Sequence, residues 1–403
     1  MTGVHNLGDQ LGRLRSQHGM TQEQLAERAG VSVDVIRKLE QGTRSTARIK
    51  TLVSLAGALD ANVSVLITPR TTLAPLDERD PALEAIRHAV TYGGVPGLDG
   101  PEEPADETTS LNAGASTAWR VWQRGDYSTV AAILPSLVAE ARNACRHLDG
   151  DAQVDAYGHL ATAYEAAAGV AIMLGMDDLA WLAAERAVQA GQGNGTPVVA
   201  ASTRHWASWI LRRQGRYTES VTVATRAAED HEPSLMRATA AELAVWGGLL
   251  VNASGAAARN EQPERADELL SYARGAAGRL GRDHTDRWSV FGPRLVAQTA
   301  ITNSVEVGDY ELALQRAAAV DTTEGTLPPT WETRYLLGLA QAQVEQHHDV
   351  EAVATLVKAA ATAPEWVRYY RLARDVTLEL WRRPVRRHST QLAEVARHLG
   401  LPN

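Results

Sequence analysis

Six short turns recur at intervals of about 40–50 residues beyond residue 110, and this period constrains the fold more than any other feature of the chain. The turns carry small and acidic residues, as in RGDYSTV and VGDYELA, and alanine-rich segments follow them. Each interval has room for two antiparallel helices, and stacked helical hairpins bury a continuous core between neighbours. We therefore expect an all-α fold in which residues 111–403 form an α-solenoid. The turns span residues 124–130, 174–180, 214–220, 260–266, 307–313 and 346–352.

The composition also favours helices over strands. Alanine and leucine are abundant, and phenylalanine occurs once, at Phe291. With 403 residues the chain exceeds one core of ordinary size, so we expect a small domain joined to an extended repeat array. The single cysteine, Cys145, has no partner for an internal disulfide, and its alanine-rich surroundings predict a buried side chain.

The sequence shows no signal for export or membrane insertion. No apolar run reaches the roughly 18 residues that span a bilayer. The first ten residues, MTGVHNLGDQ, lack the apolar core of a signal peptide. A lone cysteine suits a reducing compartment. We therefore expect a cytoplasmic protein with no membrane partner.

The charge is unevenly distributed along the chain. The net charge of −8 argues by itself against a nucleic-acid partner. Residues 1–70, however, carry nine Arg and Lys against six Asp and Glu, whereas residues 71–403 carry 31 against 42. This asymmetry suggests a basic nucleic-acid-binding module attached to an acidic domain with another task.

The basic segment contains the start and stop signals of short helices. Leu7, Leu11 and Leu14 at helical spacing predict a first helix, with a stop signal at His18-Gly19. Thr21 and Gln24 have the spacing of a capping box at the start of a second helix. Gly30 suits the left-handed residue of the tight turn that follows.

A third helix follows that turn, with Ser32 as its expected N-cap. Ile36 and Leu39 give this helix its apolar face, and a glycine at position 42 is expected to end it. Two further short helices are predicted over residues 49–59 and 63–68. The first 70 residues are thus expected to form a small five-helix domain.

The stretch TQEQLAERAGVSVDVIRKLEQG resembles the lambda-repressor-like (XRE) helix-turn-helix family almost throughout. The resemblance covers roughly residues 7–68 and implies sequence-specific binding to double-stranded operator DNA, hence a nucleoid-associated protein. Because single helix-turn-helix units contact few bases, most relatives bind two half-sites as homodimers. The alternative is a helical domain of the same shape that binds only protein.

The resemblance places the third helix in the major groove of DNA. If Ile36 and Leu39 face the core, Arg37 and Lys38 point outward with donors suited to guanine O6 and N7. Asp34 either accepts a hydrogen bond from cytosine N4 or pairs with a neighbouring arginine. Basic residues after this helix carry no base information and suit phosphates. The expected DNA-binding residues are Gln22 at a phosphate, Ser32, Val33 at a thymine methyl, Asp34, Arg37, Lys38, and Arg44, Arg48 and Lys50 at phosphates.

Residues 71–110 read as a linker that contains one short helix. The segment 69–80 is polar and contains prolines, a helix is predicted over 81–90, and the stretch after it is rich in Gly, Pro and acidic residues. We therefore expect three parts: a DNA-binding domain at 1–70, this linker, and the repeat domain at 111–403.

The repeat region resembles tetratricopeptide-like repeats, in segments such as LAWLAAERAVQAG and DRWSVFGPRLVAQTAITNSVEVGDYELA. Helix-turn-helix regulators with such C-terminal domains are common in GC-rich filamentous bacteria. The peptide-sensing RRNPP group shares this architecture, and there asparagines on inner helices bind peptide. The resemblance implies that the repeats dimerise, sense a small-molecule or short-peptide effector, or both.

Tryptophans recur on the first helix of the predicted pairs. They either pack between hairpins or, in part, line a concave ligand surface with polar residues of the same inner helices. The candidate ligand-binding residues are Trp206, Arg237, Asn252, Arg294, Gln298 and Asn303.

Motifs of enzymes and cofactor sites are missing from the sequence. We find no P-loop, no GxSxG and no dinucleotide fingerprint. Asp283, His284 and Asp286 suggest a loop between helices more than a metal site, because no second histidine cluster has ligand spacing. We therefore expect no catalytic residue, no metal and no cofactor.

Three functions stay open at this point. The first is an effector-responsive transcription regulator, and the second is a DNA-bound scaffold whose repeats recruit a protein without a small molecule. The third is an enzyme with a DNA-binding appendage. A cavity ringed by tryptophan and arginine would favour the first function, and an open apolar groove would favour the second.

Overall fold

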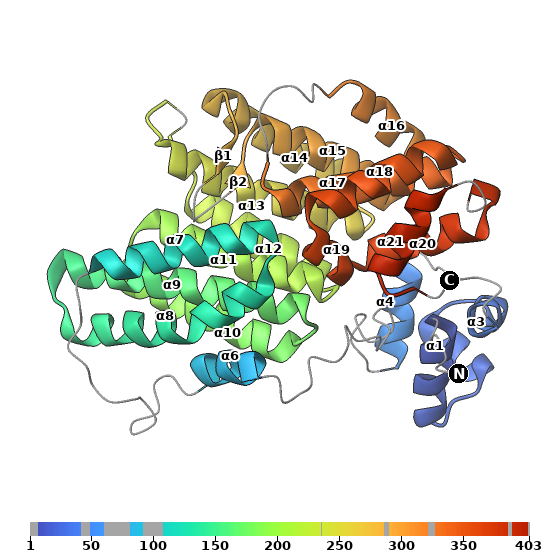
Figure 1. The fold of residues 1–403 in the computed structure, drawn as a ribbon, viewed down its shortest axis with the longest axis horizontal. Helices are drawn as coiled ribbons and strands as arrows, with labels where there is room; N and C mark the ends of the chain where they lie inside the picture. Colours follow the sequence, from blue (N-terminus) through green and yellow to red (C-terminus); the bar gives the residue numbers. More distant parts are fainter. Residues whose placement is uncertain are drawn as a thin grey trace. The chain divides into compact units, whose positions relative to one another are not determined.

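The computed structural model describes residues 7–41, 49–59, 81–91, 108–234, 236–285, 290–320, 327–385 and 389–401 (Figure 1). In this part of the chain nearly all regular structure is helical, as predicted. The exception is an antiparallel pair of two-residue strands, β1 (His284–Thr285) and β2 (Val290–Phe291). The chain divides into two compact units, residues 1–80 with 211–217 and residues 81–210 with 218–403.

The N-terminal unit contains four described helices around a small apolar core. Leu11, Leu25, Ile36, Leu39 and Leu55 are fully buried in it. The first helix ends at Gln17, directly before the predicted stop signal at His18-Gly19, and a fifth helix predicted over 63–68 lies outside the described residues. The helices are α1 (Leu7–Gln17), α2 (Gln22–Ala29), α3 (Val33–Glu40) and α4 (Ile49–Ala58).

Gly8 allows α1 to pack directly on α3. A Cβ atom at this position would overlap the carbonyl group of Leu39 and the Cα atom of Glu40. The backbones of the two helices therefore approach one another more closely than any side chain at position 8 would permit. The position of α3 thus depends on this glycine.

The second unit consists mainly of helical hairpins, and each predicted turn joins the two helices of one hairpin (Figure 1). A short helix, α6 (Pro81–Thr91), precedes the hairpins and packs on α8, and three helices follow them. The hairpins are α7 (Thr108–Arg124) with α8 (Tyr127–His147), α9 (Gly150–Met173) with α10 (Asp177–Asn194), α11 (Pro197–Arg213) with α12 (Tyr217–Asp230), α13 (Ala240–Arg259) with α14 (Pro263–Leu280), α15 (Pro293–Val307) with α16 (Tyr310–Ala318), and α17 (Pro329–Glu345) with α18 (Asp349–Thr362). The last helices are α19 (Pro364–Tyr369), α20 (Arg371–Arg382) and α21 (Thr390–His398).

The turn sequences explain why the helices stop and restart where they do. In each hairpin turn one residue adopts positive φ, a glycine in four turns and Glu261 or His347 in the other two. In the turns that read Gly-Asp-Tyr, the aspartate then caps the second helix. The Oδ1 atoms of Asp126 and Asp309 accept from the backbone N–H groups of Thr129 and Leu312, both at 3.0 Å.

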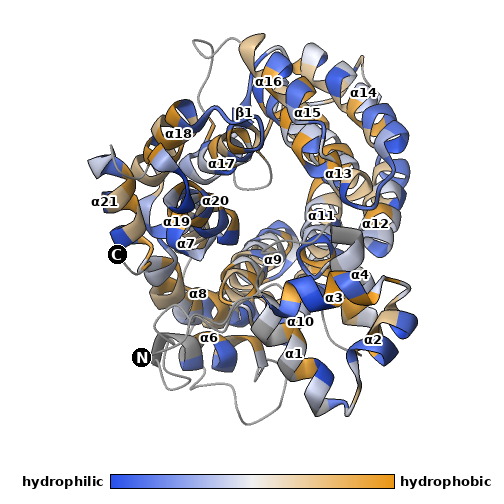
Figure 2. Cartoon of the chain, turned by 90° about the vertical axis from the view of Figure 1, so that its right-hand side faces the viewer, coloured by the Kyte–Doolittle hydropathy of each residue, from blue (hydrophilic) through white to orange (hydrophobic). Residues whose placement is uncertain are grey.

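The hairpins follow one another around the second unit, so that α7 of the first hairpin packs against α17 of the last (Figure 2). Helices α9 and α13 are buried on nearly all sides over most of their length. Alanines provide much of the contact between α9 and α10, where Ala180, Ala183 and Ala187 are fully buried. These small residues let paired helices pack closely, as the repeat pattern predicts.

The strand pair covers part of α13 and was not predicted. Phe291, the only phenylalanine in the chain, is fully buried, and its ring lies where a Cβ on Gly247 would stand. Two-residue strands are too short to show a periodic pattern, so no sequence pattern predicts them.

Two smaller expectations concern the cysteine and the membrane. Cys145 is buried, as predicted, and burial raises the pKa of its thiol to about 12, so the thiolate is suppressed. None of the helices in the described ranges combines the length and the apolar character that a membrane span requires.

Candidate nucleic-acid interface

The turn between α2 and α3 is built by the residues that the sequence indicated. The Thr21 backbone N–H donates to Gln24 Oε1 at 2.8 Å, and the Gln24 backbone N–H donates to Thr21 Oγ1 at 3.2 Å. This capping box fixes the start of α2. Gly30 ends the helix with φ of +64°, a left-handed conformation that glycine adopts without strain.

Helix α3 presents one apolar and one charged face. Ile36 and Leu39 are fully buried, whereas Asp34, Arg37 and Lys38 are exposed. The polar face therefore points away from the core of the N-terminal unit, as the sequence predicts. This orientation leaves the side chains of Arg37 and its neighbours available to a ligand of the helix.

Among the described residues, Asp34 forms an ion pair with Lys38 and not with an arginine. Lys38 Nζ lies 2.8 Å from Asp34 Oδ2, one helical turn away. The hydrogen bond from Lys38 lowers the pKa of the Asp34 carboxyl. Both side chains are more than half exposed, so the pair contributes little to stability and can open at low cost.

A polar cluster that the sequence analysis missed holds three helices together. Glu40, at the end of α3, accepts hydrogen bonds from Arg15 Nε at 2.8 Å, Arg15 Nη2 at 3.0 Å and Gln22 Nε2 at 2.7 Å. Arg15 Nη1 also donates to the carbonyl of Met20 at 2.8 Å. The hydrogen bond to Glu40 raises the pKa of Arg15. Gln22, expected at a phosphate, is thus positioned by Glu40.

The structure describes only some of the other expected DNA-binding residues. Val33 is half-buried in the first turn of α3. Ser32 is exposed at the N-cap of α3, but its side chain makes no capping hydrogen bond. Arg44 and Arg48 lie outside the described residues, and Lys50 lies on α4 with its side chain outside them.

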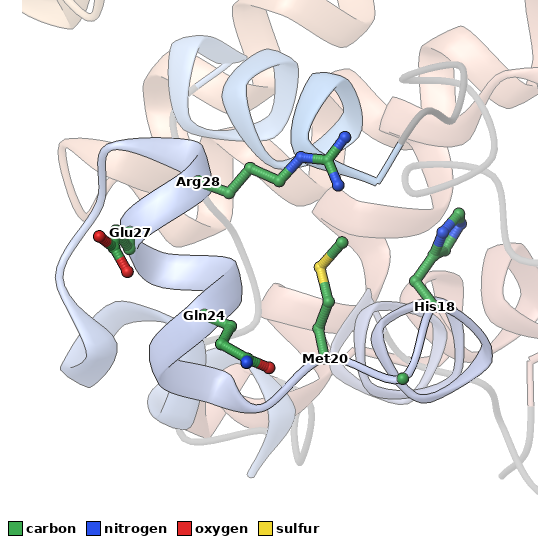
Figure 3. Close-up of a pocket in the computed structure, with 6 residues that line it drawn as sticks. His18, Met20, Gln24, Glu27 and Arg28 are labelled. Atoms are coloured by element: carbon green, nitrogen blue, oxygen red, sulfur yellow. The ribbon is translucent and has the colours of Figure 1, made fainter.

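A shallow hollow opens on the N-terminal unit where α1 ends and α2 begins (Figure 3). Met20 lies at its centre and packs partly against the core. Its polar lining mixes one acidic with basic and neutral residues, so the hollow has no strong preference for a charged ligand. It is lined by His18, Gly19, Met20, Gln24, Glu27 and Arg28.

Comparisons with known proteins agree with this geometry. A family model described as a helix-turn-helix domain matches residues 6–66. The uncharacterized HTH-type transcriptional regulator y4dJ of Sinorhizobium fredii is 40% identical over 63 residues, which are 16% of this chain and 80% of that protein. The chain belongs to the helix-turn-helix transcriptional regulators. This assignment confirms the resemblance found for residues 7–68.

A solved structure is similar over a larger part of the regulator. The crystal structure of Bacillus thuringiensis PlcR, in complex with the peptide PapR7 and DNA, aligns with 78% of this chain and 94% of that chain. The sequence identity is 12% and the TM-score is 0.37.

In the second unit of the regulator, two of the candidate ligand-binding residues form the same hydrogen-bond pattern in successive hairpins. Asn252 Nδ2 donates to Ser208 Oγ at 2.6 Å, and Ser208 donates to the Ser220 carbonyl at 2.8 Å. One hairpin further on, Asn303 Nδ2 donates to the hydroxyl of Ser254 at 2.7 Å, and that serine donates to a carbonyl of α14 at 2.7 Å. Each asparagine thus links its helix to the preceding hairpin.

Two more candidates form a cluster between α15 and α17. Arg294 Nη2 lies 3.2 Å from both carboxylate oxygens of Glu332, and Gln298 Nε2 donates to Glu332 Oε2 at 2.8 Å. The side chains of Arg294 and Glu332 are only 10% and 15% exposed. The carboxylate of Glu332 therefore already accepts hydrogen bonds from the side chains that were expected to bind a ligand.

The remaining two candidates lie elsewhere. Trp206 is buried against tryptophans of α7 and α11, as the core-packing alternative expects. Arg237 was expected on an inner helix, and this placement is wrong. It lies exposed in the turn between α12 and α13, because α13 begins only at Ala240 with Thr239 as its N-cap.

The loop considered for a metal also has another role. Asp283 Oδ1 accepts from the backbone N–H of Arg294 at 3.1 Å, and His284 belongs to β1. Asp286 lies outside the described residues. Among the residues that the structure describes, no group of His, Cys, Asp and Glu side chains is arranged to hold a metal ion.

Proposed function

We propose that this regulator binds a specific DNA operator as a homodimer through the outward face of α3, and that its helical-hairpin unit responds to an effector. The orientation of α3 carries the proposal. Buried Ile36 and Leu39 leave Asp34, Arg37 and Lys38 exposed on a short helix preceded by a capped helix and a tight glycine turn.

Arg37 is the main candidate for base recognition. Its guanidinium has two parallel donors for O6 and N7 of guanine. Lys38 has the same acceptors within reach once its exposed ion pair opens, and Asp34 is then left to accept from cytosine N4. Val33 is assigned to a thymine methyl group. Phosphate contacts are assigned to Gln22, Ser32, Arg44, Arg48 and Lys50.

A dimer follows from the small footprint of one helix-turn-helix unit. Two half-sites about 34–36 Å apart, one turn of DNA, suit two copies of α3. We assign the dimer contact to the repeat region, because residues 111–403 offer far more surface than residues 1–70. Residues 71–110 then connect the two domains.

The effector response rests on the size and composition of the second unit. It is much larger than DNA binding requires, and aromatic and polar side chains lie in its interior. A ligand changes DNA affinity only if it binds one arrangement of the protein better than another. We propose a small molecule or a short peptide as the effector.

A DNA-bound scaffold is the second candidate, and one observation favours it. The amide donors of Asn252, Asn303 and Gln298 are already hydrogen-bonded within the unit. These residues therefore stabilise the array, and the unit then serves to recruit a protein partner.

Genome-wide binding of the tagged full-length chain tests the proposal. We expect a limited set of bound promoters that share a two-part sequence motif, and loss of these peaks for Arg37→Ala at equal protein abundance. Peaks without a common motif, or identical peaks for Arg37→Ala, would contradict recognition through α3. The genes next to the bound promoters would also indicate the class of effector.

A further inference from the structure

Five tryptophans of the second unit form one indole cluster: Trp119 and Trp122 of α7, Trp206 and Trp209 of α11, and Trp331 of α17. The rings of Trp119 and Trp122 stack with centroids 5.3 Å apart. Trp122 also meets Trp206, Trp209 and Trp331 edge to face at 5.1, 6.3 and 5.4 Å. Five of the nine tryptophans within the described ranges thus gather at one place.

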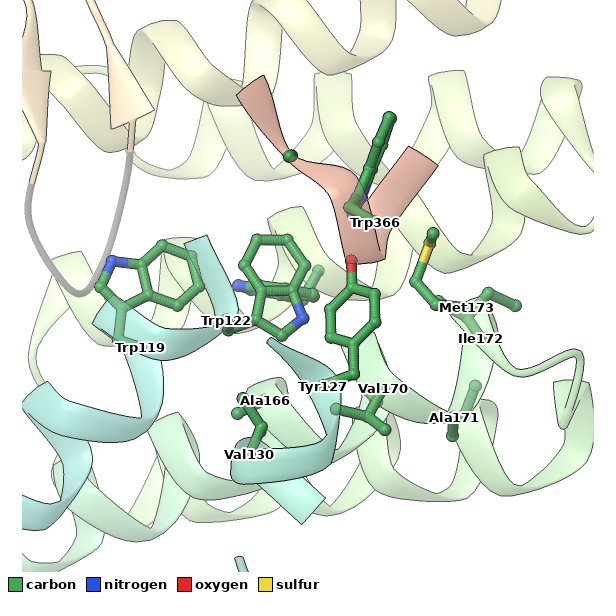
Figure 4. Packing of buried hydrophobic residues seen from close by; sticks show 14 of the residues in the cluster. Trp119, Trp122, Tyr127, Val130, Ala166, Val170, Ala171, Ile172, Met173 and Trp366 are labelled. Atoms are coloured by element: carbon green, nitrogen blue, oxygen red, sulfur yellow. The ribbon is translucent and has the colours of Figure 1, made fainter. Parts of the chain in front are cut away.

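The cluster lies where the first hairpin meets the last, a junction that we call the seam. Thr330 Oγ1 donates to the carbonyl of Gln123 at 2.9 Å, across 207 residues of sequence. At the rim, Ser128 Oγ donates to Glu365 Oε1 at 3.1 Å. Figure 4 shows Trp119 and Trp122 next to one another, with Tyr127 between Trp122 and Trp366. The two sides of the seam belong to opposite ends of the helical array, so they can separate without breaking a hairpin.

Two buried donors of α7, the helix on one side of the seam, lack an acceptor, and Trp122 Nε1 lies against Gly169 of α9. Trp122 Nε1 and Gln123 Nε2 receive no hydrogen-bond partner from the residues that the structure describes, although these side chains are only 6% and 8% exposed. Trp246, which is 8% exposed on α13, donates its Nε1–H to the Ala228 carbonyl at 3.1 Å. A buried donor without an acceptor costs free energy, and native proteins keep few of them.

We propose that the seam is the effector site, and that its ligand has a planar aromatic body and a carbonyl or carboxylate oxygen. The ligand enters by separating α7 from α17, and its ring then stacks on the indoles. Its oxygen accepts from the N–H groups of Trp122 and Gln123, which gain the acceptor that the closed seam denies them. This inference rests on the proposed effector response and names the ligand class for it.

The side chains at the seam favour a neutral or acidic aromatic ligand over a cation or a purely aliphatic molecule. Indole faces and edges pair best with another aromatic ring. The two N–H donors require an acceptor atom on the ligand and repel a cation. The five indoles are themselves neutral, so a neutral amide oxygen serves as well as a carboxylate.

Titration calorimetry of the full-length chain tests the proposal with three probes. We expect 2-naphthoate and 2-naphthamide to bind with one site per chain, and cyclohexanecarboxylate, which lacks the aromatic ring, to bind at least about 10-fold more weakly. Trp122→Phe keeps an aromatic ring and removes the donor, so it should weaken both naphthyl probes about 10-fold. Trp246→Phe, the matched control outside the seam, should change affinity by less than about 2-fold.

Three results would overturn the inference: no heat with either naphthyl probe, equal binding of cyclohexanecarboxylate, or equal losses in Trp122→Phe and Trp246→Phe. If Trp122→Phe does not fold, Gln123→Leu removes the second donor and should weaken the same probes. DNA binding of the wild-type chain is measured separately by fluorescence anisotropy. Operator binding without naphthyl binding rejects the seam site alone, whereas no operator binding rejects the proposed regulator.

Discussion

At the scale of single residues, Glu40 holds three helices of the N-terminal unit together. Its carboxylate accepts hydrogen bonds from α1 and α2 at once, through Arg15 and Gln22. Its side chain is only 11% exposed, so the loss of this acceptor would leave nearly buried donors without a partner.

Glu40→Ala should therefore lower the free energy of unfolding of the N-terminal unit by about 1–3 kcal/mol. Urea denaturation of the full-length chain, followed by circular dichroism, measures the change. Glu27→Ala is the matched control, because Glu27 is exposed on α2 and should cost less than about 0.5 kcal/mol. Equal effects of the two substitutions would argue against the role of Glu40.

Residue patterns in the sequence predicted local contacts well and distant contacts poorly. The bond between Thr21 and Gln24 spans three residues, and the left-handed Gly30 directly follows a helix, so both were visible as short motifs. The bond between Arg15 and Glu40 spans 25 residues and depends on how α1 packs against α3. No spacing of residues in the sequence predicts such a long-range hydrogen bond.

At the scale of secondary-structure elements, tight packing depends on particular glycines. Gly247→Ala would place a methyl group inside the ring of buried Phe291, where α13 meets β2. We expect a loss of about 1–3 kcal/mol. Gly275→Ala in α14 meets open space and should be neutral or stabilising by up to about 1 kcal/mol. Thermal unfolding distinguishes the pair, and comparable melting temperatures would contradict the packing described here.

The asparagine-to-serine hydrogen bonds between successive hairpins lead to a second prediction at this scale. Asn303→Ala removes the donor to Ser254 and should destabilise the second unit by about 1–3 kcal/mol, because the site is buried. Gln315→Ala, on the solvent side of α16, is the control. If Asn303 instead binds an effector directly, the substitution should spare unfolding in urea and abolish ligand binding.

The elements themselves were largely predictable because each hairpin turn is a local signal. A residue with positive φ followed by an aspartate cap marks turns such as those at Asp126 and Asp309. Arg237 was misplaced because the turn before Thr239 is longer than the others. The strand pair carried no signal, since a two-residue strand cannot show alternation.

At the scale of the whole molecule, the closure of α7 on α17 was beyond prediction. Contacts between residues more than 200 positions apart, such as Gln123 and Thr330, leave no periodic trace in one sequence. Their tryptophans were visible, but a pattern alone does not decide whether such side chains line a groove or fill it. The structure shows that they fill it.

The proposed homodimer gives a prediction about the operator. Nuclease footprinting of a bound promoter should protect two half-sites whose centres lie about 10–10.5 base pairs, or a multiple of this distance, apart. Sedimentation of the full-length chain at the same concentration should give the mass of a dimer. A single protected half-site together with a monomeric mass would refute the dimer.

Recognition of bases by Arg37 is the central claim, and fluorescence anisotropy with two duplexes at one salt concentration tests it directly. One duplex carries the operator motif and the other a random sequence. Arg37→Ala should weaken operator binding by about 1–3 kcal/mol, or roughly 5- to 150-fold, and leave binding to the random duplex nearly unchanged. Equal losses on both duplexes would show that Arg37 contacts only the DNA backbone and would contradict the account.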